Sequence, residues 1–343
     1  MLGGCDAGLG DGEDELSPGP PRDIAFGFND NSVRDGQLSA SRDAELAAGA
    51  GAEVLRVAVE WRGLEERRDV YDWELFDGIY RALRARGMRP LWIPVFAPSW
   101  AWDRGVRCSG NCPYPPRRSE LGEWEELLEL LARRYPESVG IELWNEPNLA
   151  AFWRPRPDAA RYTELLRRGY RAIKKVRPEL PVVLGGLSNR PRSGRGGDSL
   201  SEFLEAVYRH GGRGHMDAIA IHPYLRDRIR PATERTIEQV LAIRRRHDDE
   251  GTPLWVTEFG ASTTGQVLRE RWSEEEQATA LVDGYDFLSQ VPGVEMFLVH
   301  TLLDPPLDRS SREAGFGLVR PDGSLRPAYC AFARRLRGAG VRC

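Results

Sequence analysis

The sequence has no long apolar run, and it contains few lysines. None of its 343 residues lies in an uninterrupted apolar stretch of about 18 residues, so we predict no transmembrane helix. Lys174 and Lys175 are the only lysines among 48 basic residues, which indicates the codon bias of a GC-rich genome rather than a guanidinium-based function. Basic residues nearly balance the 52 acidic ones, and the net charge of −4 suggests no nucleic acid partner.

Several catalytic classes lack their signature residues. The five histidines include no His-x-His pair, so a metal-dependent hydrolase would lack ligands, and we predict neither a metal nor a cofactor. The absence of a Gly-x-Ser-x-Gly elbow argues against a serine hydrolase. Gly49 and Gly51 precede an expected strand instead of following one, so they do not form a dinucleotide-binding loop.

The five cysteines allow two local disulfides and leave one residue over. Cys108 and Cys112 lie four positions apart, and Cys330 and Cys343 lie close together near the C-terminus. Two disulfides would indicate an oxidising compartment, and free cytosolic thiols are the alternative. We therefore expect an extracellular or cell-surface protein.

The remaining cysteine, Cys5, follows Leu2-Gly3-Gly4, and this string resembles the last part of a bacterial lipoprotein signal. The basic and apolar regions of such a signal do not precede it. Residues 1–22 are rich in glycine, acidic residues and proline, which predicts a flexible tail. If Cys5 is lipidated, this tail is a tether to the membrane.

From residue 23 onward, apolar segments alternate with amphipathic helical segments. Strands are expected at 24–28, 54–59, 90–95, 140–144, 182–185, 217–221, 254–257 and 294–299. Helices are expected at 44–48, 73–86, 120–135, 159–176, 200–208, 236–248, 274–289 and 328–337. Apolar strands without alternation, each followed by a helix, indicate a parallel sheet that is buried on both faces. Eight such units predict a single α/β domain over 23–343, a (β/α)8 barrel without an accessory β-domain. A doubly wound sheet is the alternative, but it has fewer repeats.

Two glutamates follow strands that face each other across such a barrel. Glu146 comes after the fourth strand and Glu258 after the seventh, and active sites form at these carboxyl ends. A carboxyl pair suits glycoside cleavage, because one group protonates the leaving oxygen while the other attacks the anomeric carbon or activates water. Their surroundings must drive the two pKa values apart.

The strings around both glutamates resemble a known family. Trp144-Asn145-Glu146-Pro147-Asn148, followed much later by Glu258-Phe259-Gly260, resembles the retaining glycoside hydrolases of clan A. The first string is similar to glycoside hydrolase family 39 and its bacterial exopolysaccharide-hydrolase relatives. The resemblance covers nearly the whole chain after residue 22, and His222 and Tyr224 lie between the two glutamates in the expected order.

The resemblance implies a role for each of these residues. Glu146 would be the general acid/base and Glu258 the nucleophile, while Asn145 would bind the sugar 2-hydroxyl. Tyr224 would donate a hydrogen bond to the nucleophile, and Arg56 would hold it by a charge-assisted bond. A retaining mechanism predicts carboxyl groups about 5–5.5 Å apart, against about 6.5–9.5 Å for inversion.

Further residues are candidates for binding substrate. His222 would line the same wall as Tyr224. Trp100, Trp144 and Trp153 are candidate sugar-stacking platforms, although core packing is an equal alternative for Trp100 and Trp153. His300 stands where the family often has an aromatic residue after the eighth strand. Glu142 is expected to face the other side of its strand and is left out.

We therefore predict a retaining O-glycosyl hydrolase that acts on an extracellular poly- or oligosaccharide. Exo-acting relatives in family 39 carry extra β-domains, and a barrel alone resembles the endo-acting exopolysaccharide hydrolases more, so endo action is expected. The alternatives are an exo-acting β-glycosidase of the same clan and a carbohydrate-binding barrel that has lost catalysis. We expect a monomer.

Overall fold

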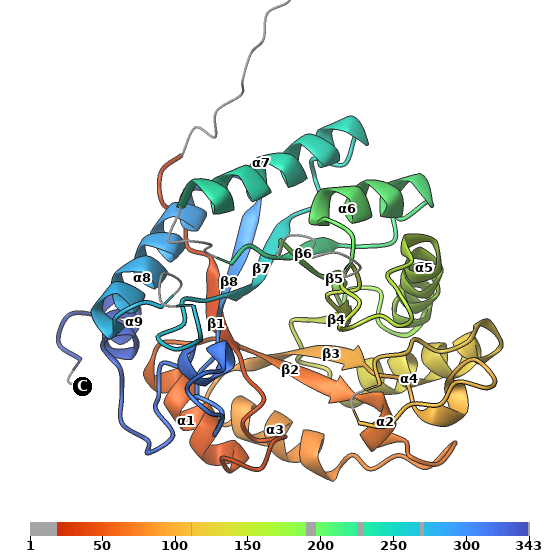
Figure 1. Ribbon diagram of the computed structural model, residues 1–343, viewed down its shortest axis with the longest axis horizontal. Coiled ribbons are helices and arrows are strands. Elements are labelled where there is room, and N and C mark those ends of the chain that lie inside the picture. The colour runs from red at the N-terminus through yellow and green to blue at the C-terminus, as the bar shows by residue number, and fades with distance from the viewer. Residues whose placement is uncertain (1–18, 111, 190–196, 225–229, 268–270, 342–343) are drawn as a thin grey trace, which may run out of the picture.

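The computed structural model describes residues 19–110, 112–189, 197–224, 230–267 and 271–341. Eight parallel strands form one closed barrel in sequence order, with β8 paired to β1 (Figure 1). The strands are β1 Ala25–Asn29, β2 Val54–Glu60, β3 Arg89–Val95, β4 Gly140–Asn145, β5 Val182–Ser188, β6 Ala218–His222, β7 Leu254–Phe259 and β8 Val294–His300. The predicted (β/α)8 barrel is confirmed, and the described residues contain no separate β-domain.

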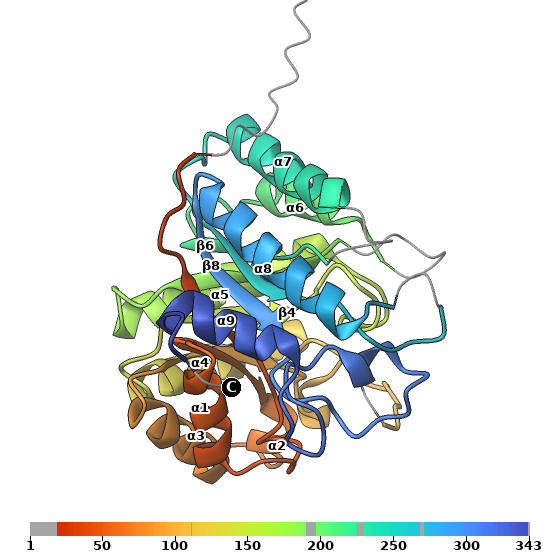
Figure 2. The same cartoon turned by 90° about the vertical axis from the view of Figure 1, so that its left-hand side faces the viewer.

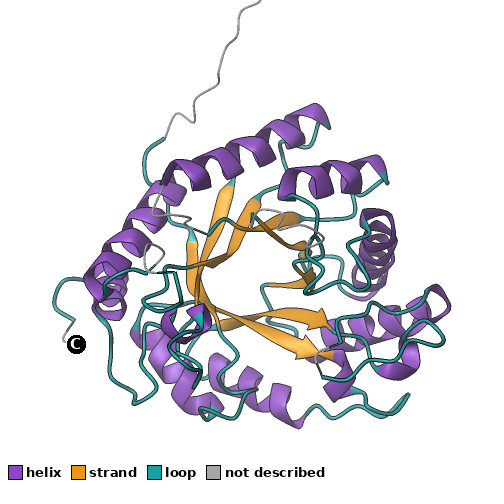
Figure 3. Cartoon of the chain, in the orientation of Figure 1, coloured by secondary structure: helices purple, strands orange, loops and turns teal. Residues whose placement is uncertain are grey.

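Helices surround the strands on the outside of the barrel (Figure 3). They are α1 Ala40–Gly49, α2 Trp61–Leu64, α3 Glu74–Arg84, α4 Leu121–Arg134, α5 Ala159–Val176, α6 Leu200–Arg209, α7 Arg230–Arg246, α8 Glu274–Gln290 and α9 Pro327–Arg337. Local sequence sets several of these boundaries. Ser199 and Ser273 begin α6 and α8 with capping boxes, in which the glutamate three residues later returns a bond to the cap. The short helix α2 was not expected from the sequence.

The barrel interior is apolar at one end and polar at the other. Side chains of Val54, Leu91, Val183 and Leu298 belong to one buried cluster inside the sheet. Strand side chains alternate between faces, so Arg56 in β2 points to the same side as Val54, one layer closer to the carboxyl end of the strand. The apolar layers therefore support a layer of charged groups at the mouth of the barrel.

The helix after β8 completes the ring. Helix α9 packs beside α8 on the outer surface, where Arg335 forms an ion pair with Asp286 (Figure 2). Gly19 and Arg22 donate backbone hydrogen bonds to Gln290 and Ser289, so the described part of the expected tail lies against the barrel. Residues 1–18, including the lipidation candidate Cys5, lie outside the described residues.

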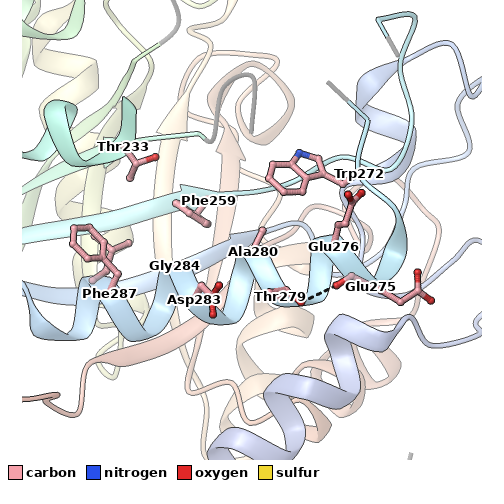
Figure 4. A pocket seen from close by; sticks show the side chains of 11 residues that line it. Thr233, Phe259, Trp272, Glu275, Glu276, Thr279, Ala280, Asp283, Gly284 and Phe287 are labelled. Atoms are coloured by element: carbon pink, nitrogen blue, oxygen red, sulfur yellow. Dashed lines mark hydrogen bonds between the residues drawn. The ribbon is translucent and has the colours of Figure 1, made fainter. Parts of the chain in front are cut away.

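An apolar groove on the outside of the barrel is distinct from its mouth. It has a volume of about 410 Å³, and its walls come from α7, α8 and the outer face of β7. Figure 4 shows Phe259 and Trp272 among its lining side chains, with Glu275 and Asp283 on α8. No described helix is long and apolar enough to cross a membrane.

One of the two expected disulfides is present in the described part of the chain. Cys108 and Cys112 are bonded, with their Cα atoms 6.0 Å apart. Cys330 is also disulfide-bonded, but Cys343 lies outside the described residues, so their pairing stays a prediction.

Candidate active site

The barrel brings Glu146 and Glu258 together at its mouth. Glu258 belongs to β7, and Glu146 comes directly after β4. Both side chains are buried, and a carboxylate oxygen of each lies within 4.8 Å of the other and of a His222 ring nitrogen. The two carboxyl groups therefore lie close to each other at the mouth of the barrel.

Glu258 lies in a strongly positive environment. Its Oε1 accepts a hydrogen bond of 2.7 Å from Arg56, and its Oε2 accepts one of 2.6 Å from the Tyr224 hydroxyl. Burial by itself raises the pKa of Glu258, but His222, Arg56 and His300 together with the Tyr224 bond hold that pKa well below its usual range. Glu258 is therefore ionised, as a nucleophile must be.

Glu146 has a different set of neighbours. Its Oε1 lies 3.0 Å from His222 Nδ1, and His222 Nε2 lies 3.1 Å from the Thr257 hydroxyl. Among the described residues, no arginine or lysine forms an ion pair with Glu146, whereas Glu258 is bonded to Arg56. The two carboxyl groups thus have the unequal surroundings that acid and nucleophile roles require. The backbone of Glu146 is left-handed, with φ of 40°.

Arg56 forms hydrogen bonds with several polar side chains of the site. Its guanidinium donates to both oxygens of Glu142, at 2.9 and 2.6 Å, and also to Glu258. It further donates to the side-chain oxygens of Asn29 and Asn145, at 2.8 and 2.9 Å. Through these bonds Arg56 links Glu142, Glu258, Asn29 and Asn145 in one hydrogen-bond network.

The expected position of Glu142 was wrong. Its side chain is completely buried inside the barrel, where it bonds to Arg56 and accepts a hydrogen bond of 2.8 Å from the Gly186 backbone. Trp144, two residues later, has φ of 80° and turns out of the strand pattern instead. The side chain that does not point into the barrel is therefore that of Trp144. The regular alternation of strand residues could not predict this exception.

The tryptophans do not form the expected sugar platforms. Trp144 and Trp153 are buried and pack edge to face on each other, and the Trp144 indole donates to the Phe152 carbonyl. Trp100 packs against Trp61 and lies under the Arg68 guanidinium, and it does not line the cavity. The large apolar surfaces of these tryptophans pack against other protein side chains and do not face a sugar. Phe96 and Phe152, stacked with centroids 6.5 Å apart, supply aromatic surface in the cavity instead.

The cavity between these groups has a volume of about 330 Å³. Its wall includes the charged residues Arg34, Glu60, Arg62 and Glu313, which sequence reasoning did not identify. Glu60 forms ion pairs with both arginines and is the last residue of β2, so its place at a strand end was a usable signal. Glu313 lies in a short 3-10 helix, Arg312–Gly315, after β8 and carried no such signal.

His300 occupies the end of β8, as expected, and lines the cavity. Its Nδ1 lies 2.9 Å from the Asn29 amide nitrogen and its Nε2 lies 3.1 Å from Glu313. Burial alone lowers the pKa of His300, but the hydrogen bond to Glu313 and the charges of Glu258 and Glu313 raise it above the usual value.

Glu146, His222 and Glu258 are also close enough to hold a cation. Each of these groups already has a protein partner, however, because His222 contacts Glu146 while Arg56 and Tyr224 occupy both oxygens of Glu258. The direct bond from a guanidinium to one of the three ligands disfavours a metal ion there.

Comparison with known proteins agrees with this geometry. The model of glycosyl hydrolases family 39 matches residues 51–286. A β-xylosidase of Geobacillus stearothermophilus is 25% identical over 299 residues, which cover 78% of this chain and 56% of the relative.

Solved structures share the fold. A family 39 glycoside hydrolase of Bacteroides cellulosilyticus WH2 superposes with a TM-score of 0.70 at 24% identity, covering 91% of this chain and 63% of that one. A monomeric β-xylosidase of Caulobacter crescentus CB15 has a TM-score of 0.67 at 22% identity, over 95% and 70% of the two chains. The chain thus spans less than two thirds of the length of the Geobacillus β-xylosidase and of the Bacteroides enzyme. With the family match over most of the barrel, the carboxyl pair at its mouth and the shared fold, the chain belongs to glycosyl hydrolases family 39.

Proposed function

We propose that this protein is a retaining O-glycosyl hydrolase, with Glu258 as nucleophile and Glu146 as general acid/base. The observation that carries this proposal is the unequal environment of two carboxyl groups whose oxygens lie within 4.8 Å. Arg56 and Tyr224 keep Glu258 ionised, so it can attack the anomeric carbon. Among the described residues, Glu146 forms no ion pair with an arginine or a lysine and contacts His222 instead, and we assign to it the transfer of a proton to the leaving oxygen.

The same groups serve both steps of a double displacement. In the first step, Glu258 forms a bond to the anomeric carbon while Glu146 gives its proton to the departing alcohol. In the second step, Glu146 takes a proton from water, and the resulting hydroxide displaces Glu258 from the sugar. Asn145, oriented by Arg56, is placed to hydrogen-bond the sugar 2-hydroxyl as positive charge develops on the ring.

We propose terminal β-xylosyl residues as the first substrates to test. The similarity to a β-xylosidase along 78% of this chain supports this choice, and so does a cavity of only about 330 Å³. These observations favour exo action over the endo action that we expected from the sequence. Early products of defined xylo-oligosaccharides separate the two: xylose together with the chain shortened by one unit supports exo action, whereas cleavage at internal bonds supports an endo-acting enzyme.

Azide rescue tests the two glutamate roles directly. With an activated aryl β-glycoside and azide, E258A should form a glycosyl azide of inverted configuration, because azide attacks in place of the nucleophile. E146A should form the azide of retained configuration, because azide takes the place of water in the second step. E60Q is the matched control, since Glu60 lines the same cavity but forms its ion pairs with Arg34 and Arg62. Equal losses in all three variants would contradict the assignment.

We further propose that the protein acts outside the cytoplasm on an oligo- or polysaccharide, as a monomer. The Cys108–Cys112 bond supports an oxidising compartment. Mass spectrometry of the native protein tests the lipid anchor, because an unmodified Cys5 would remove it. Gel filtration of the native protein tests the monomeric state.

A further inference from the structure

Two aspartates meet in the interior beside the active-site cavity. Asp30 follows β1 directly, and Asp43 lies in the first turn of α1. Their side chains are only 3% and 1% exposed. Ser32 contacts both, because its backbone N–H donates to Asp30 Oδ2 at 2.8 Å and its hydroxyl donates to Asp43 Oδ1 at 3.1 Å.

The two carboxyl groups receive very different numbers of hydrogen bonds. Asp30 Oδ1 accepts from the Thr301 hydroxyl at 2.5 Å and from the backbone N–H groups of Leu302 and Leu303, at 3.1 and 3.2 Å. With the Ser32 N–H, four donors converge on Asp30, whereas the Ser32 hydroxyl is the one donor that the described residues direct to Asp43. Asp30 is thus well supplied with hydrogen-bond donors, and Asp43 is not.

Within the described ranges, no arginine, lysine or histidine forms an ion pair with Asp30 or Asp43. At the end of β8, His300 interacts electrostatically with Asp30. On α1, Arg42 forms an ion pair with Glu45 at the surface. Two carboxylates that share a buried site cannot both be ionised, so one of them holds a proton.

We propose that Asp43 is protonated and donates a hydrogen bond to the Asp30 carboxylate, which positions the segment Thr301–Leu303 that follows His300 in the active-site cavity. Hydrogen-bond counting assigns the proton, because Asp30 already accepts four bonds while Asp43 accepts one. Burial and the neighbouring charge of Asp30 also raise the pKa of Asp43 well above its usual value. The protonation of Asp43 does not depend on the proposed function, whereas the expected effect on glycoside turnover rests on the proposed function.

The protonation state is tested by unfolding in denaturant between about pH 5 and 8, with D43N and the wild type compared. A pKa that is higher in the folded than in the unfolded chain means that folding takes up a proton, so the wild type loses stability against D43N as pH rises. The ratio of the unfolding constants of wild type and D43N should increase by about tenfold per pH unit. E45Q, an exposed carboxylate of the same helix, should follow the wild type in parallel. Parallel curves for D43N and wild type would overturn the proposal.

If D43N does not fold, carbon NMR of the wild type labelled at the aspartate carboxyl carbons decides the question. An Asp43 carboxyl resonance at the protonated position, unchanged from pH 5 to 8, supports the proposal, and one at the ionised position refutes it.

The positioning role has its own readout. D43N keeps a neutral donor toward Asp30 and should retain wild-type kcat/KM near pH 7. D43L removes the donor and should lower kcat/KM by about tenfold, with the loss mainly in kcat because His300 and its loop are displaced. A folded D43L with wild-type kcat would refute the positioning role. If the wild type hydrolyses no glycoside, the proposed function fails, but the unfolding experiment still decides the protonation of Asp43.

Discussion

Replacing Arg56 by lysine tests whether one guanidinium organises the active site. Arg56 donates five hydrogen bonds, two to Glu142 and one each to Glu258, Asn29 and Asn145. A lysine ammonium keeps the charge but has three N–H donors at a single point, so at least two of these bonds must be lost. Lysine lacks the planar guanidinium that reaches both Glu142 and Glu258, so we expect the hydrogen bond to Glu258 to be lost.

The magnitude follows from the strength of such bonds. A hydrogen bond to a charged group contributes about 1.5–3 kcal/mol, so kcat/KM should fall by about 10- to 100-fold. The pKa of Glu258 should rise toward its usual value, which moves the acid limb of the pH–rate profile to higher pH. Partial loss of the buried pair with Glu142 should also lower the free energy of unfolding by up to about 3 kcal/mol.

The assay is kcat/KM against pH on an aryl β-xyloside, together with urea unfolding. R168K is the matched control, since Arg168 makes a similar two-bond pair with Glu125 between outer helices, where its side chain is 36% exposed. This control should change neither the acid limb nor turnover. A folded R56K protein with wild-type kcat/KM and an unmoved acid limb would refute the reasoning.

Four further outcomes are expected. Tyr224→Phe removes the hydroxyl bonded to Glu258, so the acid limb should move to higher pH and kcat/KM should fall by about tenfold; an unmoved limb would contradict this. Glu142→Gln breaks a buried ion pair and should lower the free energy of unfolding by about 3 kcal/mol in urea titrations. Cys108→Ser with Cys112→Ser should cost about 2 kcal/mol of unfolding free energy in urea titrations without reductant, and an unchanged midpoint would contradict this. A chelator such as EDTA should leave turnover of the wild type unchanged, because partners within the protein already engage both catalytic glutamates; a loss that zinc restores would contradict this.

The structure also explains how acid affects stability. The pKa of Glu258 is lower in the folded protein than in the unfolded chain. Its ionised form therefore stabilises the fold above the unfolded pKa, and this contribution is lost as pH falls through the folded pKa. Asp43 acts in the opposite direction, because its raised pKa makes folding take up a proton.

The barrel fold and the pair of carboxyl groups at its mouth could both be predicted from the amino-acid sequence. Apolar strands without alternation can be buried only in a sheet covered on both faces, and their eight repeats predicted the closed barrel. Because catalytic side chains in this fold follow the strands, Glu146 and Glu258 could be located from local strings alone. The resemblance placed Arg56 and Tyr224 beside Glu258, and both side chains donate hydrogen bonds to its carboxylate.

Only the tertiary structure decided which side chains share the cavity. Glu142 reaches Arg56 across 86 positions in sequence, and Trp144 leaves the strand face through a left-handed backbone that no period reveals. Glu313 and the Asp30–Asp43 contact likewise depend on how loops and helices pack over the barrel. Local sequence sets the period and the ends of each element, whereas the partners of a buried charge depend on distances that exist only after the barrel closes.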